Sequence, residues 1–187
     1  MANRNTQGFG LIPAGTLGST PATAGQGKYK IDAGYGTTIY NGGAVASSAG
    51  YIVEGQGTDT PILGVLNGIF YNAATTLKPT FANFYKQPIT PANSEDIDAF
   101  VYDNPQQQYV VATDDAVAQS GYLETYDMNT TAGSDTTGKS SATLDIGDTS
   151  ADAASWRLLR SAEDPENDEN AAFRSVVVVA NLIELQS

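Results

Sequence analysis

The chain has 187 residues, no cysteine and no histidine, and its 21 acidic against nine basic side chains give a formal net charge of −12. The lack of cysteine excludes disulfides and thiolate metal sites, and the lack of histidine removes the commonest transition-metal ligand and the side chain that titrates near neutral pH. A carboxylate pair or a lysine remains able to do chemistry, but most hydrolase and metalloenzyme mechanisms lose a usual participant. We therefore expect no enzyme, no catalytic or metal-binding residue and no cofactor.

Charge is unevenly distributed along the chain. Residues 1–31 carry Arg4, Lys28 and Lys30 and no acid, hence +3, whereas residues 32–187 carry 21 acids and six bases, hence −15. Because duplex binding needs a lysine or arginine surface, we predict no direct nucleic-acid binding. The opening residues lack the apolar stretch of a secretory signal, and no apolar run is long enough to cross a bilayer. We expect no membrane association, and synthesis in the cytoplasm.

The first 28 residues are rich in Gly, Thr, Ala and Pro and show neither the strand nor the helix period. They predict an extended N-terminal arm without regular structure, followed by a single β domain over residues 29–187. Fully extended, such an arm reaches about 90 Å at roughly 3.3 Å per residue, enough to cross a neighbouring subunit. The alternative is a disordered terminus.

Short β-prone runs separated by turn residues follow from Tyr29 onward. The runs before residue 60 are Tyr29–Ala33, Thr37–Tyr40 and Tyr51–Glu54. Between Pro61 and Asn72 two apolar runs flank Asn67-Gly68, the pair that best adopts a type I′ turn, so we predict a hairpin there. Ile97–Asp103 stops at Asn104-Pro105, and Gln108–Thr113 is predicted to return beside it as a second hairpin.

The C-terminal third continues this pattern. Ala142, Leu144 and Ile146 alternate with polar residues, Trp156–Ser161 follows, and Phe173–Leu185 predicts a strand buried on both faces around Val176–Val179. Thr90-Pro91 and Asp164-Pro165 could each begin a short helical turn, but no sustained helical period follows. The predicted fold class is all-β, an antiparallel β-barrel or sandwich with an extended N-terminal arm and little helix.

The segment Gly133–Ser140 matches the phosphate-binding P-loop pattern letter by letter. A working P-loop follows a buried strand and opens a helix whose amide groups hold the phosphates. Here a polar stretch precedes the segment, and a strand-like alternation follows it. We therefore interpret it as a loop or hairpin turn.

The acidic run over residues 163–169 lacks the spacing of a calcium-binding loop, and a solvated loop is the simpler interpretation, with cation binding left open.

The ten tyrosines are more informative, because tyrosine is enriched where proteins pack on one another. The arm and the first strands together form the candidate interface with a partner protein or another subunit, whose residues are Arg4, Phe9, Leu11, Ile12, Leu17, Lys28, Tyr29, Tyr35 and Tyr40.

Five segments carry a resemblance to a known class of proteins: ILGVLNGIFYN at 62–72, KPTFANFY at 78–85, IDAFVYDNPQQQYVV at 97–111, TTGKSSATLD at 136–145 and FRSVVVVANLIEL at 173–185. They resemble virion structural proteins of tailed bacteriophages, and more narrowly the capsid decoration proteins, also called cement or head-stabilising proteins. The similarity covers approximately residues 50–187.

This resemblance implies a small β domain, often trimeric, that sits on the outer capsid surface of the virion and contacts the major capsid protein. We expect a structural protein that stabilises the capsid by bridging adjacent capsomers, as a homo-oligomer with a trimer favoured. The alternative is a glycan- or receptor-binding module of a head fibre or tail adhesin. Chain length favours decoration, because fibres usually carry repeats or heptads and this sequence has neither.

Overall fold

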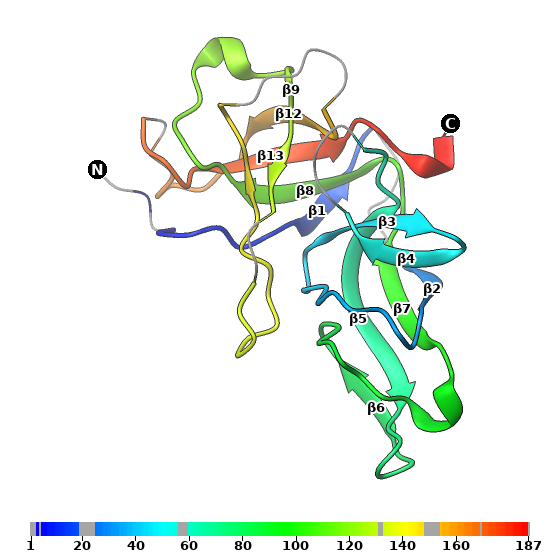
Figure 1. Ribbon diagram of the computed structural model, residues 1–187. Helices are drawn as coiled ribbons and strands as arrows, with labels where there is room; N and C mark the ends of the chain where they lie inside the picture. Colours follow the sequence, from blue (N-terminus) through cyan, green and yellow to red (C-terminus); the bar gives the residue numbers. More distant parts are fainter. Residues whose placement is uncertain are drawn as a thin grey trace.

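The computed structural model describes residues 3, 5–18, 25–55, 60–130, 133–147, 154–168 and 170–186. These residues form three antiparallel sheets packed together, arranged as two lobes (Figure 1). Their helical content is three single turns of 3₁₀ helix, at Ala92–Ser94, Gln119–Gly121 and Glu184–Gln186. The predicted all-β class with little helix is confirmed. Among the described residues, no helix has the length and apolar character needed to cross a membrane.

One lobe is built on a five-stranded sheet with the order β1-β8-β13-β12-β9. Its strands are β1 (Ile12–Thr16), β8 (Gln107–Ala112), β13 (Ser175–Ala180), β12 (Trp156–Ser161) and β9 (Thr125–Tyr126). A two-stranded sheet of β10 (Met128–Asn129) and β11 (Thr143–Leu144) packs in the same lobe. Five consecutive residues of β13 are buried, as its run of valines predicts.

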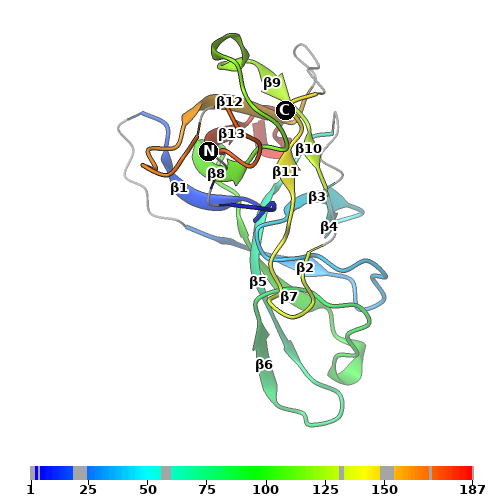
Figure 2. The same cartoon turned by 90° about the vertical axis from the view of Figure 1, so that its left-hand side faces the viewer.

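The second lobe holds a six-stranded sheet with the order β2-β7-β5-β3-β4 and with β6 paired to β5. Its strands are β2 (Gly27–Ile31), β3 (Ala44–Ser48), β4 (Tyr51–Glu54), β5 (Gly64–Asn72), β6 (Pro79–Ala82) and β7 (Ile97–Tyr102). The end strands β2 and β4 contact one another, so the sheet curls around its own core. In Figure 2 the β5–β6 hairpin forms the far end of an elongated molecule.

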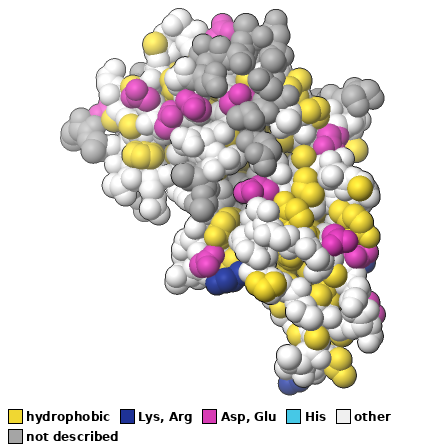
Figure 3. Space-filling model, in the orientation of Figure 1, with side chains coloured by type: hydrophobic (Ala, Val, Ile, Leu, Met, Phe, Trp, Pro, Cys, Tyr) yellow, Lys and Arg dark blue, Asp and Glu magenta, His cyan; other side chains and the backbone are white. Residues whose placement is uncertain are grey.

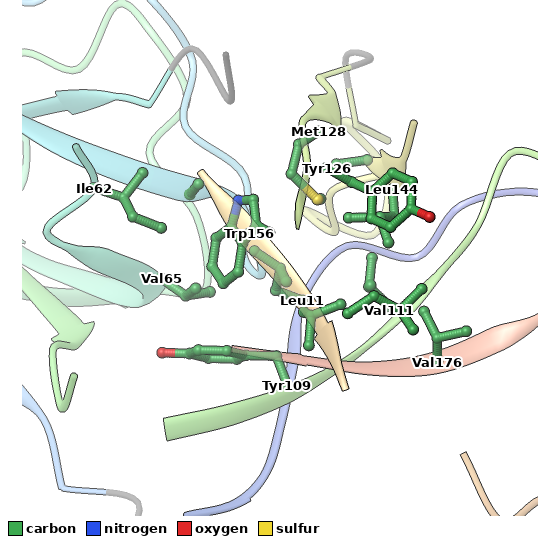
Figure 4. Packing of buried hydrophobic residues seen from close by; sticks show 14 of the residues in the cluster. Leu11, Ile62, Val65, Tyr109, Val111, Tyr126, Met128, Leu144, Trp156 and Val176 are labelled. Atoms are coloured by element: carbon green, nitrogen blue, oxygen red, sulfur yellow. The ribbon is translucent and has the colours of Figure 1, made fainter. Parts of the chain in front are cut away.

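Each lobe has a hydrophobic cluster, and the larger cluster joins the two lobes. Trp156 of β12 is fully buried and meets Tyr109 of β8 edge-to-face, with the ring centroids 5.7 Å apart. Ile62 and Val65, which come from the second lobe, belong to the same cluster. Figure 4 shows Trp156 between these two residues and Leu11. The second cluster lies inside the curled sheet and includes Ile31, Leu66, Ile69 and Ile97.

The expectation that residues 1–28 lack regular structure is wrong for Ile12–Thr16, which pair with β8 as strand β1. Leu11 is 2% exposed and packs in the larger cluster, and its backbone N–H donates to the carbonyl of Gly42 at 2.8 Å. Asn3 also donates to the carbonyl of Ala172 at 2.8 Å. This segment adds a strand to its own chain because Leu11 gains burial there. The division at residue 28 remains a prediction.

The hairpin predicted at Asn67-Gly68 is wrong, because β5 runs straight through this pair. Opposite β7 the register shifts between Leu66 and Gly68, which leaves Asn67 as the extra residue of a β-bulge. Without the bulge Leu66 and Ile69, three residues apart, would face opposite sides of the sheet. The bulge lets both enter the same core. Asn-Gly therefore forms a bulge here, and the backbone flexibility that would suit a turn allows the strand to accommodate an extra residue.

The second predicted hairpin is also wrong in its pairing, although both of its strands exist. β7 pairs with β2 and β5, whereas β8 pairs with β1 and β13 in the other sheet. The turn at Asn104, whose carbonyl accepts from the N–H of Gln107 at 2.9 Å, carries the chain from one lobe to the other. Turn residues predict where a strand ends, but they do not predict which strand the next one pairs with.

Integration of the N-terminal segment can be tested with two neighbouring residues. Leu11→Ala is expected to lower the free energy of unfolding by about 2–5 kcal/mol, because it leaves a cavity in the shared cluster. Ile12→Ala removes a side chain that is 48% exposed and is expected to cost under about 1 kcal/mol. Urea denaturation measures both values. Equal, small effects would show that this segment is not part of the core.

Candidate functional site

The N-terminal residues predicted to form an interface have different environments in the structure. Leu11 is buried in the core, and Ile12 is 48% exposed. Phe9 and Leu17 are half-buried, and Arg4 lies outside the described residues. Of the described members of this group, Ile12 therefore offers the largest exposed fraction to a partner.

Lys28, predicted as a basic contact, lies beside Lys30 on β2, and both form ion pairs with Asp98 of β7. The Nζ atoms lie 2.7 Å and 2.5 Å from the carboxylate oxygens. Partial burial opposes ionisation of Asp98, but the hydrogen bonds and charges of the two lysines prevail and lower the pKa of its carboxyl. Their charge is thus partly neutralised within the chain.

The tyrosines predicted at the interface are half-buried, and their hydroxyl groups bond within the chain. Tyr29 donates to Asp103 at 2.7 Å, and Tyr40 donates to Asp135 at 2.7 Å. Tyr35 accepts from the backbone N–H of Glu54 at 2.8 Å. In the structure the hydroxyl groups of these tyrosines connect segments of one chain. A role in contacting a partner stays a prediction.

The segment that matches the P-loop pattern is a turn closed by backbone hydrogen bonds, in agreement with its interpretation as a loop or hairpin turn. The N–H of Ser134 donates to the carbonyl of Lys139 at 2.9 Å, and that of Gly138 donates to the carbonyl of Ser134 at 2.6 Å. Asn83 and Tyr40 of the second lobe bond to this turn. Two of the amides that would have to hold phosphate are thus used inside the turn, and the described residues that follow it, 141–147, contain no helix.

Strand register in the five-stranded sheet assembles a surface that the sequence alone does not reveal. Ile12 pairs with Val110, Val110 with Val177, and Val177 with Arg160. Residues directly opposite in antiparallel strands point to the same face, so these four form one row across the sheet. A second row contains Gln108, Val179 and Arg157. We call this surface the valine–arginine face, made of Ile12, Val110, Val177, Val179, Arg157 and Arg160.

The valine–arginine face lies on the opposite side of the sheet from the larger cluster, since Tyr109, Val111 and Val178 alternate with its residues. The Nη2 of Arg160 donates to Oε1 of Gln108 at 3.2 Å, so this side chain reaches across β13. Ile12 and Arg160 are exposed, whereas Val177 in the same row and Val179 in the second row are 4% and 6% exposed. The long arginine stem is well placed to cover these valines.

Both arginines of this face lack a carboxylate partner within ion-pair distance in the part of the chain that the structure describes. Arg157 instead donates to the carbonyl of Leu123 at 2.7 Å and to Asn181 at 3.1 Å. Two positive charges therefore lie on the same face of the sheet as exposed Ile12, in a chain whose net charge is −12. Such a surface suits a partner that brings acidic groups around an apolar patch.

Sequence reasoning missed Val110, Val177, Arg157 and Arg160. The strands that hold them were predicted, but their common face follows from pairing between residues far apart in the chain, Ile12 with Val110 and Val110 with Val177. Arg157 and Arg160 are three residues apart, so simple alternation would have placed them on opposite faces, whereas the bulge between Leu158 and Arg160 places both on one face. The sequence alone shows neither this bulge nor which residues lie on the neighbouring strands.

No group of three acidic, histidine or cysteine side chains that could hold a metal occurs in the described ranges. In the acidic loop, Asp164 accepts from the backbone N–H of Glu166 at 3.0 Å, and its carbonyl accepts from the N–H of Asn167. This carboxylate thus stabilises its own turn.

Comparison with known protein families, curated protein sequences and solved structures finds no match to this chain.

Buried tyrosines predict how stability depends on pH. Burial raises the pKa of Tyr85, Tyr109 and Tyr126, and burial together with Asp103 raises that of Tyr29 to about 12. Above pH 10 tyrosines of the unfolded chain ionise while these stay neutral in the folded chain, so the free energy of unfolding falls. Between about pH 6 and 9 it should stay nearly constant, since no histidine titrates.

Denaturation in urea across this pH range, together with tyrosine absorbance, measures the effect. Tyr29→Phe should lose less free energy of unfolding than the wild type between pH 10 and 12. Tyrosines that all ionise at their ordinary pKa, or a loss of stability near neutral pH, would contradict this explanation.

Proposed function

We propose that this chain is a virion structural protein that decorates the outer capsid surface of a tailed phage, binds the major capsid protein and stabilises the shell by bridging adjacent capsomers. The observation that carries the proposal is the valine–arginine face, where exposed Ile12 and two arginines lie on one side of a sheet in an otherwise acidic β protein. The resemblance of the five sequence segments to capsid decoration proteins supplies the partner.

The composition of this face suits a contact between proteins. Arginine is enriched at protein interfaces, whose buried centres are more apolar than the rest of the surface and supply most of the binding energy. Because Ile12 and Val110 come from β1 and β8 of a continuous sheet, they are held in place before binding, which reduces the entropy lost on docking. Repulsion between acidic bodies keeps free copies apart until the shell offers its surface.

In this proposal, the shell is stabilised by the number of copies of the chain that are bound to it. Many copies that each touch two capsomers resist opening of the shell even when one contact is modest. A homo-oligomer, with a trimer favoured, would multiply the contacts of each bound unit. In this proposal the chain is made in the host cytoplasm and acts without catalysis or a cofactor.

The proposal is tested by binding purified chain to expanded shells that lack it and by measuring occupancy after sedimentation. Ile12→Asp and Arg160→Glu place negative charge on the valine–arginine face, at exposed positions that do not support the core. Each should weaken binding by about tenfold or more, the scale expected for a residue central to an interface.

Phe81→Ala is the matched control, because Phe81 is also exposed but lies on β6 of the second lobe. It should leave shell occupancy unchanged. Occupancy that all three variants share with the wild type, or wild-type chain that fails to sediment with shells, would count against the proposal.

A further inference from the structure

An open groove of about 450 Å³ lies where β5, β6 and β7 meet, on the lobe opposite the valine–arginine face. Its volume is within the range of small-molecule sites. The bulge in β5 shapes it, since Gly68 lines the groove and brings no side chain to fill it. Hydrophobic side chains reach the surface along this lobe (Figure 3).

Two phenyl rings form the apolar wall of the groove. Phe81 is 74% exposed, and its ring centroid lies 5.9 Å from that of Phe100, with the two planes only 13° apart. Phe70 touches Phe81 from another side, at 5.0 Å. These neighbours support the ring of Phe81 without covering it. A flat apolar surface held in water favours a ligand with a flat apolar face of its own.

The polar part of the groove consists of side-chain amides. Gln26, Asn67 and Asn83 line it, and none of the lining residues is charged. Asn83 donates to the carbonyl of Thr137 at 2.8 Å. The side chains of Gln26 and Asn67 form no hydrogen bond with other described residues. Each amide offers both a donor and an acceptor, which is the pairing that a hydroxyl group requires.

We propose that this groove binds a neutral saccharide. The C–H face of a pyranose ring stacks on Phe81, and the sugar hydroxyls bond to the amides of Gln26 and Asn67. A nucleotide would find a ring to stack on but no cation in the groove for its phosphate, on a chain that repels nucleic acid. The activity is additional to capsid decoration, because it uses the other lobe and leaves the valine–arginine face free for the shell.

The test screens the full chain on an array of neutral oligosaccharides built from glucose, mannose, galactose and N-acetylglucosamine. Hits are then titrated by calorimetry and by NMR of the phenylalanine ring protons. The wild type should bind at least one of these sugars, and shifts should centre on Phe81 and Phe100. Phe81→Ala should weaken binding about tenfold, and Asn67→Ala should weaken it as well.

Leu77→Ala is the control, since Leu77 is 72% exposed in the turn between β5 and β6 but does not line the groove. It should bind sugar as the wild type does. No binding of any array sugar by the wild type up to about 10 mM, where even weak sites are occupied, would overturn the proposal. Equal affinity of the wild type and Phe81→Ala would overturn it too. Shell sedimentation is a separate readout, so failure here does not bear on decoration.

Discussion

Burial of one hydrophobic cluster by both lobes is the constraint on which the rest of this structure depends. The chain starts in the first lobe with β1, builds the second lobe with β2 to β7, and returns to the first with β8. Trp156 packs in a cluster that contains Leu11 from the segment before β1, Val65 from β5 and Tyr109 from β8. The two sheets therefore share a core, and surfaces at opposite ends of the molecule are held by one body.

This arrangement separates two kinds of surface. The valine–arginine face belongs to the five-stranded sheet and presents Arg160 and Ile12, whereas the groove beside Phe81 belongs to the six-stranded sheet and carries no charge. Neither surface needs a titrating group near neutral pH, which fits a chain without histidine. Binding by fixed shape and hydrogen-bonding groups is what we propose for both surfaces.

Local patterns predicted much of the fold, including the all-β class and strands β4 and β12 with their observed bounds. Pairing was not predictable, because β7 and β8 each join strands far away in the chain. The same limit applies to the candidate site. Ile12 was among the predicted interface residues, but Arg160 shares its face only because the two intervening strands align them. The aromatic wall around Phe81 likewise depends on the bulge at Asn67-Gly68, which the sequence had predicted to be a hairpin turn.

The most direct measurement of the central claim is a cryo-electron microscopy map of a particle that carries this chain, at a resolution that shows individual strands. The chain should lie on the outer shell with β1 and β8 against capsomers, and the β5–β6 hairpin should point away from the shell. A map without this chain on the shell would contradict the account. A map in which the six-stranded sheet contacts the capsomers would contradict the separation of the two surfaces.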